Sequence, residues 1–138
     1  MTDLRELVLM HYDGLNTGNV DLAVRPFSDD VAGEFPTGPT AGLAQLRATV
    51  GAFITAFPDM VVTTRNIWLD GDTAIAEMYF HGTQTGPMAT PDGELAPTGR
   101  EVAFPLIDIF TLRDGRVAEH RVFWDNASFM AQLGLLPA

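Results

Sequence analysis

The apolar residues change their spacing once along the chain, and this change limits the possible folds more than any other feature. In residues 3–57 they recur every three or four positions, as on the buried face of an amphipathic helix. From Met60 to Trp124 they alternate with other residues, as in strands that bury one face. Helices followed by a run of antiparallel strands predict an α+β fold.

Turn and cap residues divide these two regions into elements. Helices are expected over residues 3–17, 22–27, 42–57 and 127–133, with Asp21 as a cap of the second and Asp125 or Asn126 as a cap of the last. Strands are expected over residues 31–35, 61–69, 73–83, 101–112 and 116–124. Residues 36–40 are predicted to form a loop. Residues 84–100 are also predicted to form a loop, because their glycines and prolines (Pro87, Pro91, Pro97) argue against a strand. The length of this loop predicts that it is mobile and lies near a pocket mouth or a dimer edge. The sheet is expected to curl around a long helix, which leaves a cone with an apolar interior.

Length and charge exclude several classes of protein. A chain of 138 residues fits one domain, 1–138, and its 46% hydrophobic residues can build a core without disulfides. A net charge of -10 repels phosphate backbones, so nucleic acid is not an expected partner. No apolar run is long enough to span a membrane, and the charged start of the chain lacks the apolar core of a secretory signal. We therefore expect a cytoplasmic protein that does not interact with membranes.

Several kinds of chemistry lack the residues they need. The chain has no cysteine, and neither Ser28 nor Ser128 lies in a nucleophile-elbow context. The three histidines lack the spacing of metal ligands along the chain, and no glycine-rich fingerprint joins a strand to a helix. We therefore expect no metal and no cofactor. His11 and His81 lie near element ends and are expected to be exposed.

Asp108 and His120 are the candidate catalytic residues. Alternation places Asp108 with Phe104 and Phe110 on one face of a strand, where burial disfavours the charged carboxylate and suits it to accept and return a proton. His120 lies on the next strand, and counting from the turn at residues 113–115 places Asp108 opposite Arg121, with His120 one diagonal step away. The alternatives remain an Asp108 that pairs with an arginine and a His120 that donates to a backbone carbonyl.

Other residues are candidates for the wall of a substrate pocket. Tyr12 and Glu34 bring polar atoms to otherwise apolar faces, and such atoms need a partner or a ligand. Arg121 would steady an anion only if its strand is bulged, because alternation otherwise points it outward. The full set of expected substrate contacts is Tyr12, Glu34, Phe35, Phe53, Trp68, Met78, Phe80, Phe104, Arg121, Val122 and Trp124.

Several local motifs resemble the SnoaL-like polyketide cyclase family, within the nuclear transport factor 2-like superfamily. Taken together they are specific, although each alone is weak, and they cover nearly the whole chain. They are Ala56-Phe57-Pro58-Asp59-Met60, His81-Gly82-Thr83-Gln84-Thr85-Gly86, Pro97-Thr98-Gly99-Arg100, Ile107-Asp108-Ile109-Phe110, Arg113-Asp114-Gly115-Arg116-Val117, Glu119-His120 and Gln132-Leu133-Gly134-Leu135.

The resemblance implies a cone-shaped α+β barrel with a strongly curved mixed or antiparallel sheet, an apolar pocket and a dimer formed through the sheet. It also implies ring closure by intramolecular aldol condensation without a cofactor. The family commonly has Glu-His-Trp-Asp in the last strand, with that Asp as the acid/base group, whereas this chain has Val122 there. Gln84 also stands where a histidine is common.

These features support one main hypothesis and two alternatives. The main hypothesis is a cofactor-free enzyme of the cyclase or isomerase type, which abstracts a proton next to a carbonyl of a hydrophobic polyketide-like or cyclic ketone substrate. The first alternative is a hydroxylase of aromatic polyketides that has lost the cyclase aspartate at Val122 and needs oxygen and an external reductant. The second is a non-catalytic domain that binds a small hydrophobic molecule. In each case we expect a homodimer, because apolar residues occur on both faces of the strands.

Overall fold

The computed structural model describes residues 3–90 and 92–136, and within them it contains four helices. They are α1 (Leu4–Asn16), α2 (Val20–Val24), α3 (Leu43–Ala56) and α4 (Asn126–Gln132). Asp3, Asn19 and Asp125 each accept a hydrogen bond from a backbone N–H in the first turn of α1, α2 and α4. Asp21 was therefore the wrong cap for α2, because Asn19 begins that helix two residues earlier.

Six strands form the main sheet. They are β1 (Phe27–Phe35), β2 (Gly38–Ala41), β3 (Val61–Asp70), β4 (Thr73–Thr83), β7 (Glu101–Arg113) and β8 (Arg116–Trp124), in the order β2-β1-β8-β7-β4-β3. Only β1 and β8 pair in parallel, so the sheet is mixed. Strand β2 occupies much of the stretch predicted as a loop, because residues 38–41 pair back onto β1. The α+β class and the curved sheet are confirmed.

The long segment between β4 and β7 also differs from its prediction. It contains a small two-stranded sheet, β5 (Met88–Thr90) with β6 (Gly93–Leu95), despite its glycines and prolines. Pro91, on which the loop prediction partly rested, lies outside the described residues. The prediction that this segment is mobile stays a prediction.

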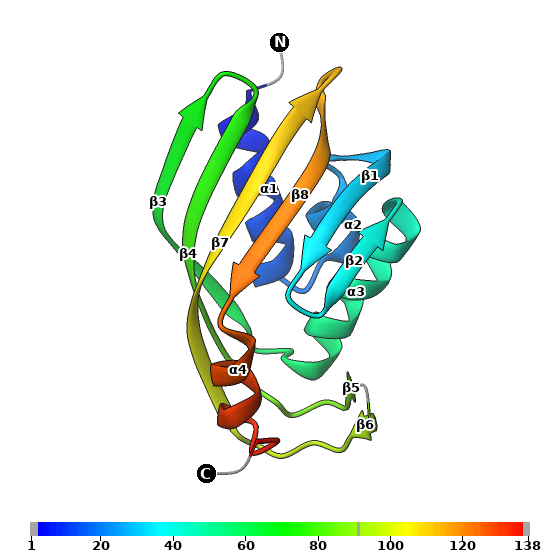
Figure 1. The fold of residues 1–138 in the computed structure, drawn as a ribbon, viewed down its shortest axis with the longest axis vertical. Helices are drawn as coiled ribbons and strands as arrows, with labels where there is room; N and C mark the ends of the chain where they lie inside the picture. The colour runs from blue at the N-terminus through cyan, green and yellow to red at the C-terminus, as the bar shows by residue number, and fades with distance from the viewer. Residues whose placement is uncertain (1–2, 91, 137–138) are drawn as a thin grey trace.

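The helices cover one face of the sheet. Figure 1 shows α1, α2 and α3 behind the long strands, with α4 and the β5–β6 hairpin at the end of the molecule where the chain terminates. Val8, Leu46 and Val50 of the helices are buried against Met78, Phe104 and Phe110 of the strands. Among the described residues, no helix is both long and apolar enough to cross a membrane.

Two bulges decide which side chains face the helices. In β3 the pairing shifts between Thr64 and Asn66, so the bulged Arg65 reverses the alternation beyond it. In the β7–β8 pair Leu112 faces Val117 and Thr111 faces Glu119, which leaves Ala118 without a partner. This second bulge places Asp108 opposite Val122 and Phe110 opposite His120. The interior of the cone therefore receives Asp108, Val122 and His120 together.

Candidate active site

An internal cavity of about 60 Å³ lies between α1, α3 and the inner face of the sheet. Most of its lining is apolar, and its polar side chains other than Thr49 gather where α1 meets β7 and β8. Nine of the expected catalytic and substrate-contact residues line this cavity: Tyr12, Phe35, Phe53, Phe80, Phe104, Asp108, His120, Val122 and Trp124.

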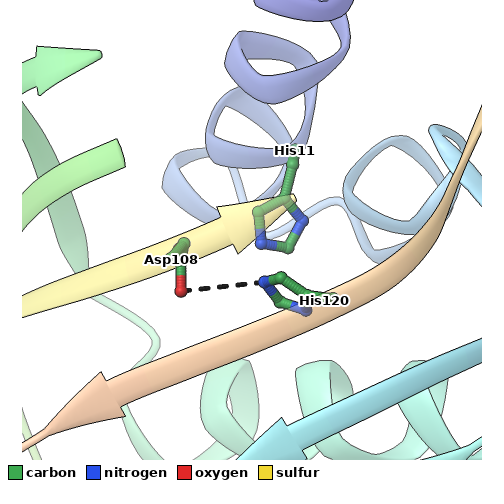
Figure 2. A group of neighbouring side chains, drawn as sticks. All are labelled: His11, Asp108 and His120. Carbon is green, nitrogen blue, oxygen red and sulfur yellow. Dashed lines mark ion pairs between the residues drawn. The ribbon is translucent and has the colours of Figure 1, made fainter. Parts of the chain in front are cut away.

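Asp108 and His120 face each other at one end of the cavity, as Figure 2 shows. Asp108 Oδ1 lies 3.7 Å from His120 Nε2, which is within the distance of an ion pair but too long for a hydrogen bond. Each side chain is only 2% exposed. Neither Asp108 Oδ1 nor either ring nitrogen of His120 has a hydrogen-bond partner among the described residues. A buried polar atom without a partner lowers the stability of a fold by about 1–3 kcal/mol, so these atoms would gain from a hydrogen bond to a ligand or to water.

Tyr12 holds the other oxygen of the carboxylate. Its hydroxyl donates a short hydrogen bond to Asp108 Oδ2. Burial, the negative charge of Asp108 and this hydrogen bond raise the pKa of Tyr12 well above its usual value. Tyr12 therefore stays a hydrogen-bond donor at neutral pH, and it leaves Asp108 Oδ1 as the oxygen available to the cavity.

His11 joins this group from α1, and the prediction that it is exposed was wrong. It is 3% exposed, and its Nδ1 lies 2.8 Å from the carbonyl oxygen of Ala23, to which it donates. Burial and the nearby His120 lower the pKa of His11 from 6.5 to about 4. Position 11 falls on the same helical face as Leu4, Val8 and Leu15, so the helical periodicity was the signal that placed it inside.

Aromatic rings fix the orientation of the His120 imidazole. The Phe110 ring stacks on it with centroids 4.8 Å apart, and Phe27 packs at 5.1 Å. Phe35 and His11 approach it edge-on at 5.6 and 5.5 Å. The position of the ring is therefore set by packing, while its nitrogens remain free to bind.

Four expected substrate contacts lie outside the cavity. Glu34 points to the outer face of β1, because Gly33 and Phe35 on either side of it face inward. Trp68 is 51% exposed, because the bulge at Arg65 reverses the alternation that would have turned it inward. Arg121 is exposed although its strand is bulged as the expected contact required, because the bulge at Ala118 places its neighbours His120 and Val122 inside. Met78 is fully buried in the core but does not line the cavity.

Three potential metal ligands meet in the same place. One atom each of His11, Asp108 and His120 can be chosen so that all lie within 4.8 Å of one another. The sequence analysis excluded a metal from spacing along the chain, but the fold brings these residues together from α1, β7 and β8 (Figure 2). The donor set, two imidazoles and one carboxylate, is one that divalent transition metals accept.

A larger groove of about 530 Å³ lies outside the internal cavity. It is lined by Met88–Thr90 of the segment between β4 and β7, by Phe129 and Met130 of α4, and by side chains of α3. Thr49 and Phe53 of α3 line both the groove and the internal cavity. The groove therefore adjoins the cavity at these two residues.

The profile of the SnoaL-like polyketide cyclase family matches residues 5–133. The chain belongs to this family. No curated protein sequence matches the chain.

Solved structures agree with this assignment. A proposed SnoaL-like polyketide cyclase from Jannaschia sp. CCS1 has 27% sequence identity and a TM-score of 0.83, over 96% of this chain and 92% of that protein. TsrD from Streptomyces laurentii has 26% identity and a TM-score of 0.83, over 96% of both chains. AclR, a proposed hydroxylase from Streptomyces galilaeus, has 21% identity and a TM-score of 0.82, over 97% of this chain and 86% of that one. The likeness to AclR concerns the fold alone.

Proposed function

We propose that this SnoaL-like protein catalyses proton transfer next to a carbonyl group of a hydrophobic polyketide-like or cyclic ketone substrate. The observation that carries the proposal is the buried pair Asp108 and His120, whose facing atoms lie 3.7 Å apart and lack hydrogen bonds within the described chain. A carboxylate and an imidazole at the end of an apolar cavity are suited to general acid–base catalysis.

The contacts of Asp108 assign its two oxygens different tasks. Oδ2 is occupied by the Tyr12 hydroxyl, so Oδ1 is the atom that accepts the proton from the carbon next to the carbonyl. The electrons of the broken C–H bond move into the enolate, whose oxygen lies near His120 and accepts a hydrogen bond or a proton from it. Asp108 then returns its proton to carbon in an isomerisation. In a ring closure the enolate carbon attacks a second carbonyl, and the new alkoxide takes the proton.

The cavity sizes indicate how such a substrate would bind. A cavity of about 60 Å³ holds only the reacting end of a molecule, since sites for drug-sized ligands usually measure about 300–1,000 Å³. The adjoining groove of about 530 Å³ has the size for the rest of the substrate. Phe53 lies between the two spaces, so a shift of its side chain would join them.

Hydrogen–deuterium exchange of a hydrophobic ketone tests the proposal. NMR in D2O would follow loss of the α-proton signals of 2-tetralone in the presence of the wild type and of Asp108→Asn. The amide keeps the acceptor for Tyr12 but cannot take the proton, so we expect exchange to fall by about 10²–10⁴-fold. Asp125→Asn is the control, because Asp125 is exposed and asparagine also caps helices.

Equal exchange rates in the wild type and Asp108→Asn would contradict the assignment of the base. Saturable binding of an anthraquinone without any enzyme-catalysed exchange across a series of cyclic ketones would favour the binding-domain alternative. Far-UV circular dichroism of each variant checks that the fold is intact.

A hydroxylase is the second candidate, and Val122 is the observation that favours it. Val122 lines the cavity directly opposite Asp108, at the position where the family commonly has its acid/base aspartate. Such a reaction places one oxygen atom of O₂ in the substrate and the other in water, with two electrons from an external reductant. Oxygen uptake and a product 16 mass units heavier, dependent on the reductant, would support it.

A further inference from the structure

We propose that His11, Asp108 and His120 form a binding site for one divalent transition-metal ion of the Zn²⁺ or Co²⁺ kind. The ligands are His11 Nε2, Asp108 Oδ1 and His120 Nε2, which come from α1, β7 and β8. Figure 2 shows the three side chains pointing toward a common point. An ion can bind there whether or not the protein catalyses the proposed reaction, since binding rests on the side chains and not on a substrate.

Two of the three ligands are oriented by partners outside the site. His11 donates its Nδ1 proton to the Ala23 carbonyl, which leaves the lone pair of Nε2 free. Asp108 Oδ2 accepts from Tyr12, which leaves Oδ1 free. Histidine ligands of metals typically donate their other ring N–H to a carbonyl or carboxylate, and ligating carboxylates are themselves hydrogen-bonded. The surroundings of both side chains therefore match those of metal ligands.

The third ligand supplies an independent observation. His120 is 2% exposed, and neither of its ring nitrogens has a partner within the described residues. The facing Asp108 Oδ1 is also without a hydrogen bond there. A metal ion bound between them would satisfy one nitrogen of the imidazole and the free carboxylate oxygen at once.

Charge and donor type select the kind of ion. Two nitrogens and one oxygen suit zinc and its neighbours, whereas Mg²⁺ and Ca²⁺ prefer oxygen ligands. The single carboxylate offsets half of the charge of a divalent ion, which leaves the site open to an anionic fourth ligand.

The geometry requires only a small contraction. Metal–nitrogen and metal–oxygen distances of about 2.0–2.2 Å place ligand atoms within about 4 Å of one another. Donor atoms of the three residues, one from each, already lie within 4.8 Å of one another, so rotations of the side chains suffice. The adjoining cavity of about 60 Å³ has space for water in the remaining coordination positions, and the groove beyond Phe53 offers a route for the ion.

Metal binding and proton transfer would exclude each other. Both use Asp108 Oδ1 and His120 Nε2, so a bound ion removes the proton acceptor of the proposed reaction. Binding itself is measured without substrate, which keeps this inference separate from the proposed function if either fails.

The test is a titration of the chelator-treated protein with Co²⁺, followed by its visible absorption. We expect one equivalent to bind and to give the intense bands of a four- or five-coordinate ion, which Zn²⁺ displaces and Mg²⁺ does not. His11→Asn, Asp108→Asn and His120→Asn should each weaken binding by at least about tenfold. His81→Asn is the matched control, because His81 is exposed and lies outside the cluster.

Absence of stoichiometric binding would overturn the proposal, as would binding that is lost in His81→Asn but kept in the three other variants. If a variant fails to fold, NMR of the ring nitrogens in the wild type decides the question. Zn²⁺ should shift the Nε2 resonances of His11 and His120 and leave those of His81 unchanged. Shifts confined to His81 would refute the site.

Discussion

At the scale of single residues, the burial of His11 links the site to the stability of the fold. Its pKa is about 4 in the folded protein and 6.5 in the unfolded chain, so the unfolded chain binds more protons between these values. The free energy of unfolding should therefore fall as the pH decreases from 6.5 toward 4. The loss due to His11 should reach about 3 kcal/mol at most.

Urea unfolding at half-unit pH steps measures this dependence. His11→Asn is the matched variant, because its side-chain amide can replace the Nδ1 donor to the Ala23 carbonyl without binding a proton. Between pH 4 and 6.5 the free energy of unfolding should depend less steeply on pH in the variant than in the wild type, because the contribution of His11 is absent. Identical slopes in both proteins would show that His11 does not titrate as its burial implies.

A second residue-scale prediction concerns Val122. Its Cα is the cross-strand partner of Asp108, so Val122→Asp places two carboxylates face to face inside the cone. Like charges at a buried site raise the folded-state pKa of one of them above its unfolded value, so stability falls as the pH rises above about 4. We expect a loss of about 3 kcal/mol or more at pH 8 and a smaller loss at pH 5.

Chemical unfolding at the two pH values checks this prediction. Val122→Asn is the control, because asparagine resembles aspartate in shape and polarity but carries no charge. It should destabilise the protein equally at both pH values. Equal losses for Val122→Asp at pH 5 and pH 8 would contradict the expected repulsion.

At the scale of elements, Gln84 organises the segment that contains β5 and β6. It is fully buried, and its amide nitrogen donates to the carbonyls of Gly86 and Ala96 at 2.9 and 3.2 Å. Its Oε1 accepts from the N–H and the hydroxyl of Thr98 at 3.0 and 2.6 Å. Gln84→Ala leaves these groups without a partner, so we expect a loss of about 2–3 kcal/mol in the free energy of unfolding.

Limited proteolysis should locate the effect of Gln84→Ala. Cleavage between residues 85 and 99 is expected to be faster than in the wild type, because the hydrogen bonds of this side chain hold the segment together. Glu94→Gln, an exposed position in the same segment, is the control and should behave as the wild type. Unchanged cleavage in Gln84→Ala would show that β5 and β6 are held by other contacts.

At the scale of the whole molecule, we propose a homodimer through the outer face of the sheet. This face carries apolar side chains in two neighbouring rows, and in the first Trp68 lies opposite Ile75, which lies opposite Ile109. Ile107 and Phe123 form the adjoining row. Phe123 is 48% exposed and Trp68 51%, and exposed patches of this kind commonly mark protein–protein contacts.

Light scattering tests the dimer against the monomer mass of 15.0 kDa. We expect twice this mass for the wild type at micromolar concentration and the monomer mass for Phe123→Glu, since a charge in an apolar interface opposes association. Leu9→Glu is the control, because Leu9 is exposed on α1, on the opposite side of the sheet. A wild type of 15 kDa at all concentrations would exclude the dimer.

The residue pattern determined most of the elements and their order, but it missed β2, β5 and β6. Strands 73–83 and 116–124 have the predicted limits, β3 and β7 each extend one residue beyond the predicted end, and α1, α3 and α4 differ from prediction by one residue at each end. Local periodicity contains this information, because a helix or a strand with one buried face repeats its apolar residues at a fixed interval. Alternation also placed Asp108 and Val122 on the same side as their aromatic neighbours. The burial of His11 could have been predicted from the same periodicity, since His11 lies on the apolar face of its helix.

Only the tertiary structure decided which polar side chains meet inside the cone. Without the bulge at Ala118, Arg121 would lie opposite Asp108, and without the bulge at Arg65, Trp68 would face the helices. An extra residue inverts every later position of a strand, and its location depends on pairing with the neighbouring strand rather than on the local pattern. The grouping of His11 with Asp108 and His120 likewise depends on how α1 packs across the curved sheet, because His11 is far in the chain from the other two residues.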